Sequence, residues 1–365
     1  MHPGGAERVI SVLANYFANR YSVEIVCLSG NSSFYFLNNN VTLTYLEPKY
    51  GNNLVKKFIW LLRNVRSDSL VIAFMVNVYL FTLAALLFRN VKIVVSERND
   101  PTVHILPIRI MRKLLIWRAQ KLVVQTHDIA SYFPRLMQNK IEIVYNPISD
   151  KYVWRSGISA QKEKVIVTVG RLSPQKNHKM LINAFSFIVL EHPDYQLHIY
   201  GEGEIEEETK AYVKAKNLEG KVFFKGKCDT LWDVLPKAEI FALSSDYEGM
   251  SNALIEAMYV GLPVVTTEVS GTKELIESGK NGIVVPVGDE QKFTEALEKL
   301  IQDENLRIQL AKNAVQIIGK VQPLAIMNQW ENIISEVFKL AHCVNGCRDL
   351  HNELLQVKNA VDIAR

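Results

Sequence analysis

Short apolar runs alternate with amphipathic segments along most of the chain. Runs rich in Val, Ile and Leu predict buried strands, and apolar residues spaced three and four apart predict helices. The predicted strands of a first series are 21–28, 41–47, 69–75, 91–97, 121–126 and 141–148. Those of a second series are 165–170, 195–201, 221–226, 238–245, 263–268 and 281–288.

The two series predict an α/β protein with two domains. Strands that alternate with helices form parallel sheets, so each series indicates a doubly wound, Rossmann-like domain. We place the N-terminal domain at 1–150 and the C-terminal domain at 151–321, and expect a helix at about 322–340 to pack back on the first domain, with a tail at 341–365. Because such sheets bind ligands beyond their carboxyl ends, we expect a site in the cleft between the domains.

The first residues, MHPGGAERVISVLANYFANRY, predict a glycine loop followed by an amphipathic helix. A doubly wound domain has a strand before such a loop, and the pattern here lacks that first N-terminal strand. Truncation of the chain and a genuine lack of the strand both remain open as explanations. A parallel sheet without the strand would expose apolar edges and lose stability.

Residues 70–88 contain no charged side chain, and the segment is about long enough to span a bilayer. The alternative is a buried strand at 70–75, a turn at Asn77 and a buried helix at 79–88. We favour the second interpretation, because parallel strands that are covered on both faces also appear as continuous apolar runs.

The composition of the 365 residues indicates a globular protein, with 48% hydrophobic and 22% charged residues. A net charge of +4, without aromatic residues interleaved among Lys and Arg, does not favour a nucleic-acid partner. No signal peptide opens the chain, and four cysteines do not make a disulfide framework. We therefore expect a cytoplasmic protein.

The loop after the first strand of the second series, VGRLSPQKN, is a candidate anion site. Gly170 permits a tight turn, and Arg171 and Lys176 precede a helix. Two cations at this position suit a diphosphate, which Arg binds as a fork and Lys as a point charge. An ordinary solvated loop is the alternative.

The segment EGMSNALIEAM holds two glutamates at the end of a later strand. Ser251 or the next residue can cap a helix whose first amides, near Gly249 and Met250, attract phosphate. Glu256 lies further along this helix, where it suits the hydroxyls of a ribose, and Glu248 can meet the other end of the ligand. The alternative for Glu256 is a solvent-facing position.

Two further glycine segments are weaker candidates. The segment YGEGE at 200–204 lacks the third glycine of a dinucleotide fingerprint and is interpreted as a turn before a surface helix, with an edge contact to a nucleoside as the functional alternative. The segment from 270 to 289 begins with Ser-Gly-Thr. These residues either provide further backbone amides to the ligand or form an ordinary loop.

Seven motifs in order, GGAERV, YNPI, VGRLSPQKN, GEGE, EGMSNALIEAM, GLPVVTTEVSGTKELIESGKNGIVVPVGD and QWENII, resemble the retaining glycosyltransferases of family 4. The resemblance covers nearly all of residues 4–335. It implies the GT-B fold and a bacterial hexosyltransferase of polysaccharide biosynthesis that moves a sugar from a nucleotide-sugar, for which we expect a UDP-sugar. The implied acceptor is a glycan or a lipid-linked oligosaccharide.

The resemblance also implies roles for residues. Glu248 would contact the donor sugar and Glu256 the ribose, while Arg171 and Lys176 would neutralise the departing diphosphate. The family needs no metal or other cofactor, and the sequence contains no convincing Asp-x-Asp motif.

Two more regions of the donor site follow from the same resemblance. Gly4 and Gly5 would let the N-terminal loop approach the donor phosphates, and the amides near Gly249 and Met250 would complete the cradle. Many relatives have a histidine after a strand in the middle of the first domain, where this chain has Glu97, Arg98 and Asn99. Arg98 or Asn99 is a candidate for contacts with the acceptor or the donor sugar.

Two other function classes remain open. UDP-N-acetylglucosamine 2-epimerases share the fold, but they need acid and base groups near C2 of the sugar, and no convincing set is present. A non-catalytic sugar-nucleotide binder is the second, and the intact Arg171, Lys176, Glu248 and Glu256 argue against it.

Two basic segments with apolar faces, 56–66 and 104–121, predict either a peripheral contact with anionic lipid at the inner face of the plasma membrane or ordinary core helices with cationic outer faces. In the tail, His342, Cys343, Cys347 and His351 have near four-residue spacing that would suit zinc. Because Asn345 and Gly346 break the helix, free thiols are our expectation there, and no metal site.

Overall fold

The computed structural model describes residues 4–149, 152, 162–344 and 361–364, and the side chains in these ranges except those of 340–344 and 361–364. The chain forms two compact units. Unit 1 comprises 1–146 and 324–365, and unit 2 comprises 147–323. The division between the units falls after Asn146 and after Pro323.

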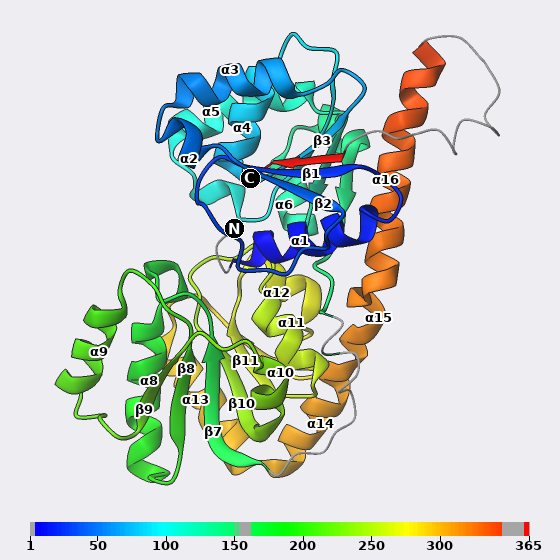
Figure 1. Cartoon of the computed structure of the whole chain (residues 1–365). Coiled ribbons are helices and arrows are strands. Elements are labelled where there is room, and N and C mark those ends of the chain that lie inside the picture. Colours follow the sequence, from blue (N-terminus) through cyan, green and yellow to red (C-terminus); the bar gives the residue numbers. More distant parts are fainter. Residues whose placement is uncertain (1–3, 150–151, 153–161, 345–360, 365) are drawn as a thin grey trace. The chain divides into compact units, whose positions relative to one another are not determined.

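Unit 1 is a parallel sheet flanked by helices, with the strand order β2-β1-β13-β3-β4-β5-β6 (Figure 1). Its strands are β1 (Val23–Cys27), β2 (Val41–Tyr45), β3 (Leu70–Phe74), β4 (Lys92–Ser96), β5 (Lys121–Val124), β6 (Ile141–Ile143) and β13 (Val361–Ala364). Its helices are α1 (Gly5–Phe17), α2 (Glu47–Tyr50), α3 (Leu54–Asn64), α4 (Val76–Ala85), α5 (Leu106–Leu115), α6 (His127–Tyr132) and α16 (Pro323–Val344).

Alternate residues of β3 face opposite sides of this sheet. Leu70, Ile72 and Phe74 belong to the core formed with α1 and α16, whereas Val71 and Ala73 belong to the core formed with α4. A strand covered on both faces needs apolar residues at every position. This explains the uncharged run and confirms the buried strand.

The other half of the uncharged run is α4. Asn77 lies inside this helix, so the predicted turn at Asn77 is wrong by two positions, and Met75, with φ 65°, makes the turn instead. Among the described residues, no helix combines the length and the hydropathy that crossing a bilayer requires.

The position of the missing first strand is occupied. β13, from the other end of the sequence, pairs in parallel with β1 and with β3. The sheet thus has a strand at the position for which the N-terminal sequence pattern predicts none, and residues 361–364 of the predicted tail supply it. No described residue before α1 forms a strand.

Unit 2 is a second parallel sheet, with the order β12-β11-β10-β7-β8-β9. Its strands are β7 (Glu163–Val169), β8 (Gln196–Tyr200), β9 (Val222–Gly226), β10 (Ala238–Leu243), β11 (Val264–Thr267) and β12 (Ile283–Val285). Its helices are α8 (His178–Glu191), α9 (Glu206–Ala215), α10 (Leu231–Val234), α11 (Asn252–Tyr259), α12 (Ser270–Leu275), α13 (Glu290–Gln302), α14 (Glu304–Ala314) and α15 (Ile318–Val321). All twelve strands predicted from the sequence are confirmed.

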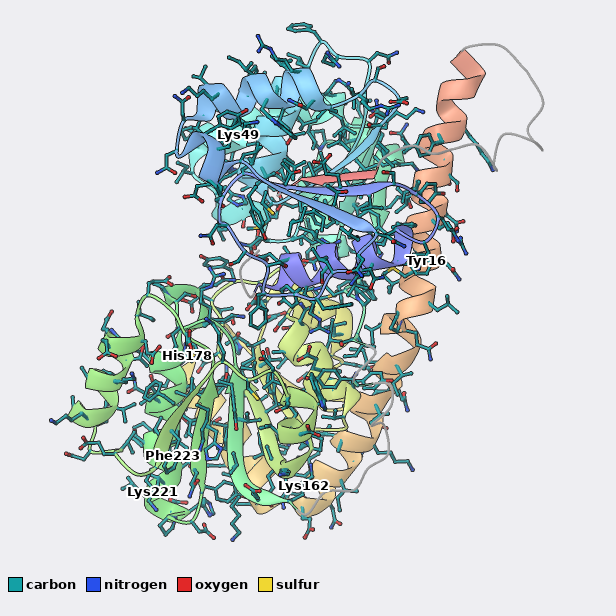
Figure 2. The ribbon with its side chains drawn as sticks, viewed as in Figure 1. Tyr16, Lys49, Lys162, His178, Lys221 and Phe223 are labelled. Atoms are coloured by element: carbon teal, nitrogen blue, oxygen red, sulfur yellow. The ribbon has the colours of Figure 1, made fainter. Side chains whose placement is uncertain are left out.

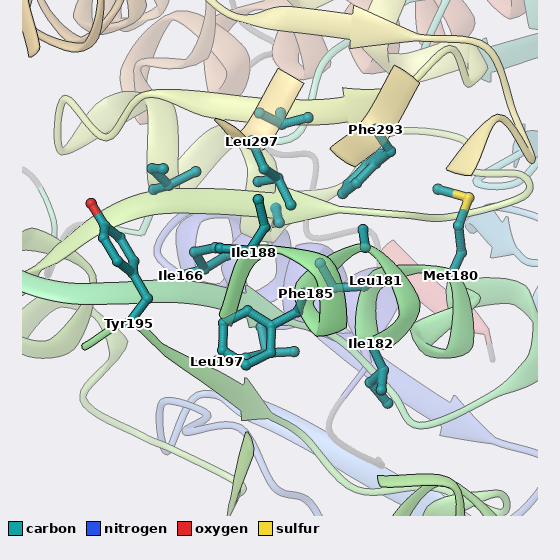
Figure 3. Packing of buried hydrophobic residues seen from close by; sticks show 14 of the residues in the cluster. Ile166, Met180, Leu181, Ile182, Phe185, Ile188, Tyr195, Leu197, Phe293 and Leu297 are labelled. Atoms are coloured by element: carbon teal, nitrogen blue, oxygen red, sulfur yellow. The ribbon is translucent and has the colours of Figure 1, made fainter. Parts of the chain in front are cut away.

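The core of unit 2 is formed by aliphatic and aromatic side chains of the sheet and of the helices against it. Figure 3 shows Phe185 of α8 and Phe293 of α13 in this cluster, and both are fully buried. In Figure 2, Lys162 and Lys221, which precede β7 and β9, lie at one end of the unit, and His178, at the start of α8, lies toward the other. The loops that follow the strands therefore gather at the end marked by His178.

Candidate functional site

The strand order of unit 2 reverses between β7 and β10. β8 and β9 extend the sheet on one side of β7, and β11 and β12 extend it on the far side of β10. In open α/β sheets, ligands bind at such a reversal, beyond the carboxyl ends of the two central strands. The loops at this position are 170–177 after β7 and 244–251 after β10, which are the two loops predicted from the sequence.

Hydrogen bonds between side chains and backbone hold these two loops together. The Ser244 hydroxyl donates to the carbonyl oxygens of Lys176 and Asn177 at 2.9 and 3.0 Å. The Gln175 side-chain amide donates to the carbonyl of Tyr247 at 2.7 Å. The sequence analysis missed Gln175 and Ser244, because polar residues in loops carry no signal of which distant loop they contact.

Lys176 and Glu248 form an ion pair at the centre of this contact. The Glu248 carboxylate also accepts a hydrogen bond of 3.0 Å from the Ser245 hydroxyl. Glu248 is 8% exposed, so its charge is largely shielded from water and depends on these partners. The structure thus brings together two of the three predicted catalytic side chains.

Two glycines of the GEGE segment shape the Arg171 loop. A Cβ added at Gly201 would lie 1.9 Å from the carbonyl oxygen of Gly170. A Cβ added at Gly203 would lie 2.1 Å from the carbonyl oxygen of Leu172. These glycines therefore allow one loop to pack directly on the other, and the turn before α9 is confirmed. Arg171 itself is exposed.

The start of α11 lies in the second loop. Ser251 caps the helix, with its hydroxyl accepting from the Leu254 amide at 3.4 Å. Gly271 packs against this segment so closely that an added Cβ would lie 2.4 Å from the Gly249 carbonyl oxygen. The backbone from Gly249 to Ser251, with Met250 buried, is thus held in place between its neighbours.

Glu256 lies inside α11 and is only 4% exposed, so the solvent-facing alternative is wrong. Its Oε2 accepts a hydrogen bond of 2.8 Å from the hydroxyl of Tyr152, which is also buried. The Tyr152 ring packs edge-on against Trp232 and Tyr259. The sequence analysis missed Tyr152, which precedes Glu256 by more than a hundred residues.

In unit 1, the predicted glycine loop leads into α1. Gly4 is the N-cap residue, and its carbonyl oxygen accepts a hydrogen bond of 3.0 Å from the Tyr35 hydroxyl. The Glu7 side chain folds back so closely that an added Cβ at Gly4 would lie 2.3 Å from its Oε2. A phosphate that approaches Gly4 and Gly5 would meet this carboxylate, so Glu7 must move or be neutralised before such a contact forms.

The Arg98 guanidinium is engaged inside unit 1. Nε donates to the Ser96 hydroxyl and Nη1 to Asn146 Oδ1, each at 2.8 Å, and the group lies 5.2 Å from the ring centroid of Phe74 and 5.8 Å from that of Trp330. Burial lowers the pKa of Arg98 to about 9. These contacts hold the guanidinium in place, and its Nη2 is buried without a hydrogen-bond partner among the described residues, so Arg98 stays a candidate for a ligand contact.

Asn99, the other candidate, is partly buried, and its side chain accepts a hydrogen bond of 2.9 Å from the Asp100 amide. A buried network fixes the loop before it. Tyr79 donates to Glu97 Oε2 at 2.7 Å, and Arg112 donates to the Tyr79 hydroxyl at 2.9 Å. Burial raises the pKa of Glu97, although these two neighbours oppose the shift. Arg112 belongs to the predicted basic segment 104–121, but it is buried and is not one of the surface cations of that segment.

Across the described residues, no group of three or more His, Cys, Asp and Glu side chains is arranged to hold a metal ion. Cys347 and His351 lie outside the described residues, and His342 and Cys343 are described only by their backbone in α16. The zinc alternative in the tail is therefore untested.

Two family models match the chain. The model of Glycosyltransferase Family 4 matches residues 3–152, and that of Glycosyl transferases group 1 matches residues 153–316. The chain belongs to this glycosyltransferase family. It is an enzyme of the glycosyltransferase class, as the resemblance implied.

Several curated relatives are similar over nearly their whole length. One, from Campylobacter jejuni, is "GalNAc-alpha-(1->4)-GalNAc-alpha-(1->3)-diNAcBac-PP-undecaprenol alpha-1,4-N-acetyl-D-galactosaminyltransferase", 28% identical in an alignment of 353 residues that covers 92% of this glycosyltransferase and 96% of the relative. Another is the amylovoran biosynthesis glycosyltransferase AmsD of Erwinia amylovora, 26% identical over 91% of this chain and 96% of the relative.

Solved structures share the fold. Anabaena HepE in complex with UDP-glucose superposes with a TM-score of 0.76 and 19% identity, covering 92% of this chain and 97% of HepE. The lipopolysaccharide outer core galactosyltransferase WaaB superposes with a TM-score of 0.66 and 22% identity, covering 92% of this chain and 96% of WaaB. These neighbours confirm that the glycosyltransferase has the GT-B fold.

Proposed function

We propose that this glycosyltransferase transfers a sugar from a UDP-sugar to a lipid-linked oligosaccharide or a growing glycan, with retention of the anomeric configuration. The observation that carries the proposal is the contact between Lys176 and Glu248 at the strand reversal of unit 2, beside the capped start of α11. HepE bound to UDP-glucose and the undecaprenol-linked substrate in the Campylobacter relative's name support the donor and acceptor classes.

In the proposed complex, the donor diphosphate forms an ion pair with Lys176, which then interacts less strongly with Glu248. The exposed Arg171 side chain moves to form a second ion pair with the diphosphate. The amides near Gly249 and Met250 donate to the same phosphates. Glu248, released from part of its ion pair, accepts hydrogen bonds from hydroxyls of the donor sugar. Fixed cations and dipoles then stabilise the charge that develops on the leaving group.

The proposed step forms one bond and breaks one. An acceptor hydroxyl attacks the anomeric carbon on the face from which the diphosphate departs, through a state with oxocarbenium character. The electron pair of the broken bond goes to the phosphate oxygen, which also receives the hydroxyl proton. Because Arg171 and Lys176 supply the positive charge, we expect turnover to be unchanged by a metal chelator.

Substitution of Glu248 and of Glu256 tests the proposed site. Glu256→Ala should weaken nucleotide affinity, whereas Glu248→Ala should mainly lower kcat, by about 10²-fold or more if its hydrogen bonds act on the transition state. Calorimetric titration with UDP and steady-state kinetics with the UDP-sugar separate the two effects. Equal losses of affinity with unchanged kcat in both variants would contradict the assigned roles.

The donor base is tested separately. Melting curves with UDP-, GDP- and ADP-sugars should show the largest increase in Tm for a UDP-sugar, because a ligand that binds only the folded state stabilises it. A larger increase with a GDP- or ADP-sugar would change the donor assignment and leave the reaction class intact.

Peripheral attachment to a membrane is part of the proposal. α3 and α5 both pack against α4 and carry exposed apolar side chains: Leu54, Val55 and Ile59 on α3, and Leu106, Ile110 and Leu114 on α5. Lys56, Arg63, Arg109 and Lys113 on the same helices are exposed as well. Mixed apolar and cationic faces bind anionic lipid surfaces, where a lipid-linked acceptor lies.

A further inference from the structure

Tyr152 donates a hydrogen bond to the carboxylate that the proposed function assigns to the ribose. Its hydroxyl lies 2.8 Å from Glu256 Oε2, and the two residues are 2% and 4% exposed. Tyr152 belongs to the first residues of unit 2, whereas Glu256 lies in the middle of α11. A bond between two buried groups therefore joins the beginning of unit 2 to the proposed nucleotide site.

Main-chain hydrogen bonds fix the segment that precedes Tyr152. The Ile148 amide donates to the carbonyl oxygen of Val321 at 3.0 Å, and both residues are buried. The Tyr152 amide donates to the carbonyl oxygen of Ser149 at 2.9 Å. The side chain of Tyr152 therefore extends from a backbone that is anchored within unit 2.

Two aromatic neighbours fix the ring of Tyr152. The ring packs edge-on against Trp232 of α10, with centroids 6.2 Å apart, and against Tyr259 of α11, with centroids 6.5 Å apart. Edge-to-face pairs of this kind favour one ring orientation. Tyr259 follows Glu256 by one helical turn, so both lie on the same face of α11. The contacts that orient the ring thus also direct its hydroxyl to the carboxylate.

A buried glutamate depends on such a donor to keep one conformation. Its side chain is long, and ordering it costs conformational entropy. A buried carboxylate that loses a hydrogen-bond donor also retains its cost of desolvation without compensation. The Tyr152 hydroxyl offsets both costs before a nucleotide binds.

We infer that Tyr152 is a positioning residue, which fixes the Glu256 carboxylate for recognition of the vicinal hydroxyls of a ribonucleotide. The inference rests on the proposed function, in which Glu256 binds the ribose. A carboxylate offers about four acceptor positions, so Glu256 can keep the Tyr152 hydroxyl and accept from ribose hydroxyls as well. Affinity and selectivity for ribose rise because the carboxylate is ordered before the ligand arrives.

Removal of the Tyr152 hydroxyl tests the inference, with UDP and 2′,3′-dideoxy-UDP as probes. In the wild-type protein, loss of both ribose hydroxyls should weaken binding at least about tenfold, because hydrogen bonds to a charged acceptor are strong. Tyr152→Phe should lower this ratio of dissociation constants at least about threefold, mainly by weakening UDP binding. Calorimetric titration measures the four constants. An unchanged ratio, as expected for a merely structural role, or tighter UDP binding would overturn the inference.

The matched control is Tyr195→Phe. Tyr195 is 3% exposed and donates to Glu239, but it precedes β8 and so lies at the end of the sheet opposite the loops of the site. Each variant removes the hydroxyl of a buried tyrosine that is bonded to a glutamate, so both should lower Tm. The ratio for the two probes should stay at the wild-type value in Tyr195→Phe. An equal fall of the ratio in both variants would overturn the inference.

A double-mutant cycle tests whether Tyr152 acts through Glu256. In a Glu256→Ala background, Tyr152→Phe should change the ratio by less than about twofold, because the group that it positions is absent. An undiminished fall of the ratio in this background would indicate that the hydroxyl contacts the ribose itself, and would overturn the positioning role.

Kinetics and the wild-type protein separate this inference from the proposed function. Tyr152→Phe should raise KM for the UDP-sugar at least about threefold and leave kcat at the wild-type value, because the ribose is bound equally in the ground state and the transition state. If the wild-type protein binds UDP and dideoxy-UDP equally, the ribose role of Glu256 in the proposed function fails, and the inference with it. If the wild-type protein discriminates and Tyr152→Phe leaves the ratio unchanged, the inference alone fails.

Discussion

Individual glycines in unit 2 are fixed by what surrounds them. Gly203 has no unusual backbone angle, yet an added Cβ would lie 2.1 Å from a backbone oxygen of the Arg171 loop. The sequence identified this residue as part of a turn, but the close approach of the other loop depends on a segment about thirty residues earlier. Packing between two backbones leaves no trace in the local pattern.

Gly203→Ala should therefore displace the loop that contains Arg171. We expect a loss of about 1–3 kcal/mol in the free energy of unfolding, typical of forced overpacking, together with weaker UDP binding. The matched control is Gly319→Ala in α15, where an added Cβ meets nothing within 4 Å and alanine favours the helix. Urea denaturation of both variants checks the prediction, which fails if the two are equally stable.

His178 is a second residue whose properties depend on packing. It is buried at the start of α8, and its Nδ1 has no hydrogen-bond partner among the described residues. Burial, with the nearby positive charge of Lys176, lowers its pKa from 6.5 to about 4. Below pH 6.5 the unfolded chain therefore takes up a proton that the folded chain resists, and the protein loses stability as the pH falls toward 4.

Lowering the pH from 7 to 5 should reduce the free energy of unfolding by about 2 kcal/mol through His178 alone. His178→Gln should lose less stability over the same interval, whatever its stability at pH 7. His198, whose pKa burial also lowers to about 4, acts in the same direction and serves as a comparison. Denaturant unfolding at both pH values measures the slopes, and parallel slopes for wild type and variant would contradict the prediction.

At the scale of elements, strand and helix positions follow from local apolar patterns. β7 and β10 were identified because Val, Ile and Phe cluster between polar turns. The start of α8 depends on finer contacts. Asn177 has φ 44°, its Oδ1 accepts from the Met180 amide at 3.2 Å, and its amide donates to Asp246 at 2.8 Å.

Two substitutions separate the contributions of Asn177. Asn177→Gly keeps the positive φ without strain and loses the cap, whereas Asn177→Ala loses the cap and strains the backbone. We expect the glycine variant to lose less stability than the alanine variant, by about 1 kcal/mol. Thermal unfolding of the two variants side by side tests this order, and equal Tm values would count against it.

At the scale of the whole molecule, the exposed apolar residues of unit 1 predict membrane binding. Leu106→Ser/Leu114→Ser should lower the affinity for anionic phospholipid vesicles at least about 10²-fold, because burial of each leucine contributes roughly 1.5–3 kcal/mol. Sedimentation with vesicles, at low and high salt, measures it.

The matched control is Leu190→Ser on α8 in unit 2. Leu190 is 78% exposed and Leu114 is 72% exposed, so each of these two substitutions replaces a leucine of similar exposure. Vesicle binding should be unchanged in the control. An equal loss in control and double variant, or none in either, would contradict a membrane surface on α3 and α5.

The sequence by itself determined the twelve strands of the two series, the α/β class and the loops that carry Lys176 and Glu248, because each of these depends on the local order of apolar, polar and glycine residues. The tertiary structure decided which distant segments meet. It joined Tyr152 to Glu256, placed the Arg98 guanidinium against both Phe74 and Trp330, and inserted β13 between β1 and β3. Such pairings depend on long-range packing and main-chain hydrogen bonds, which no local pattern records.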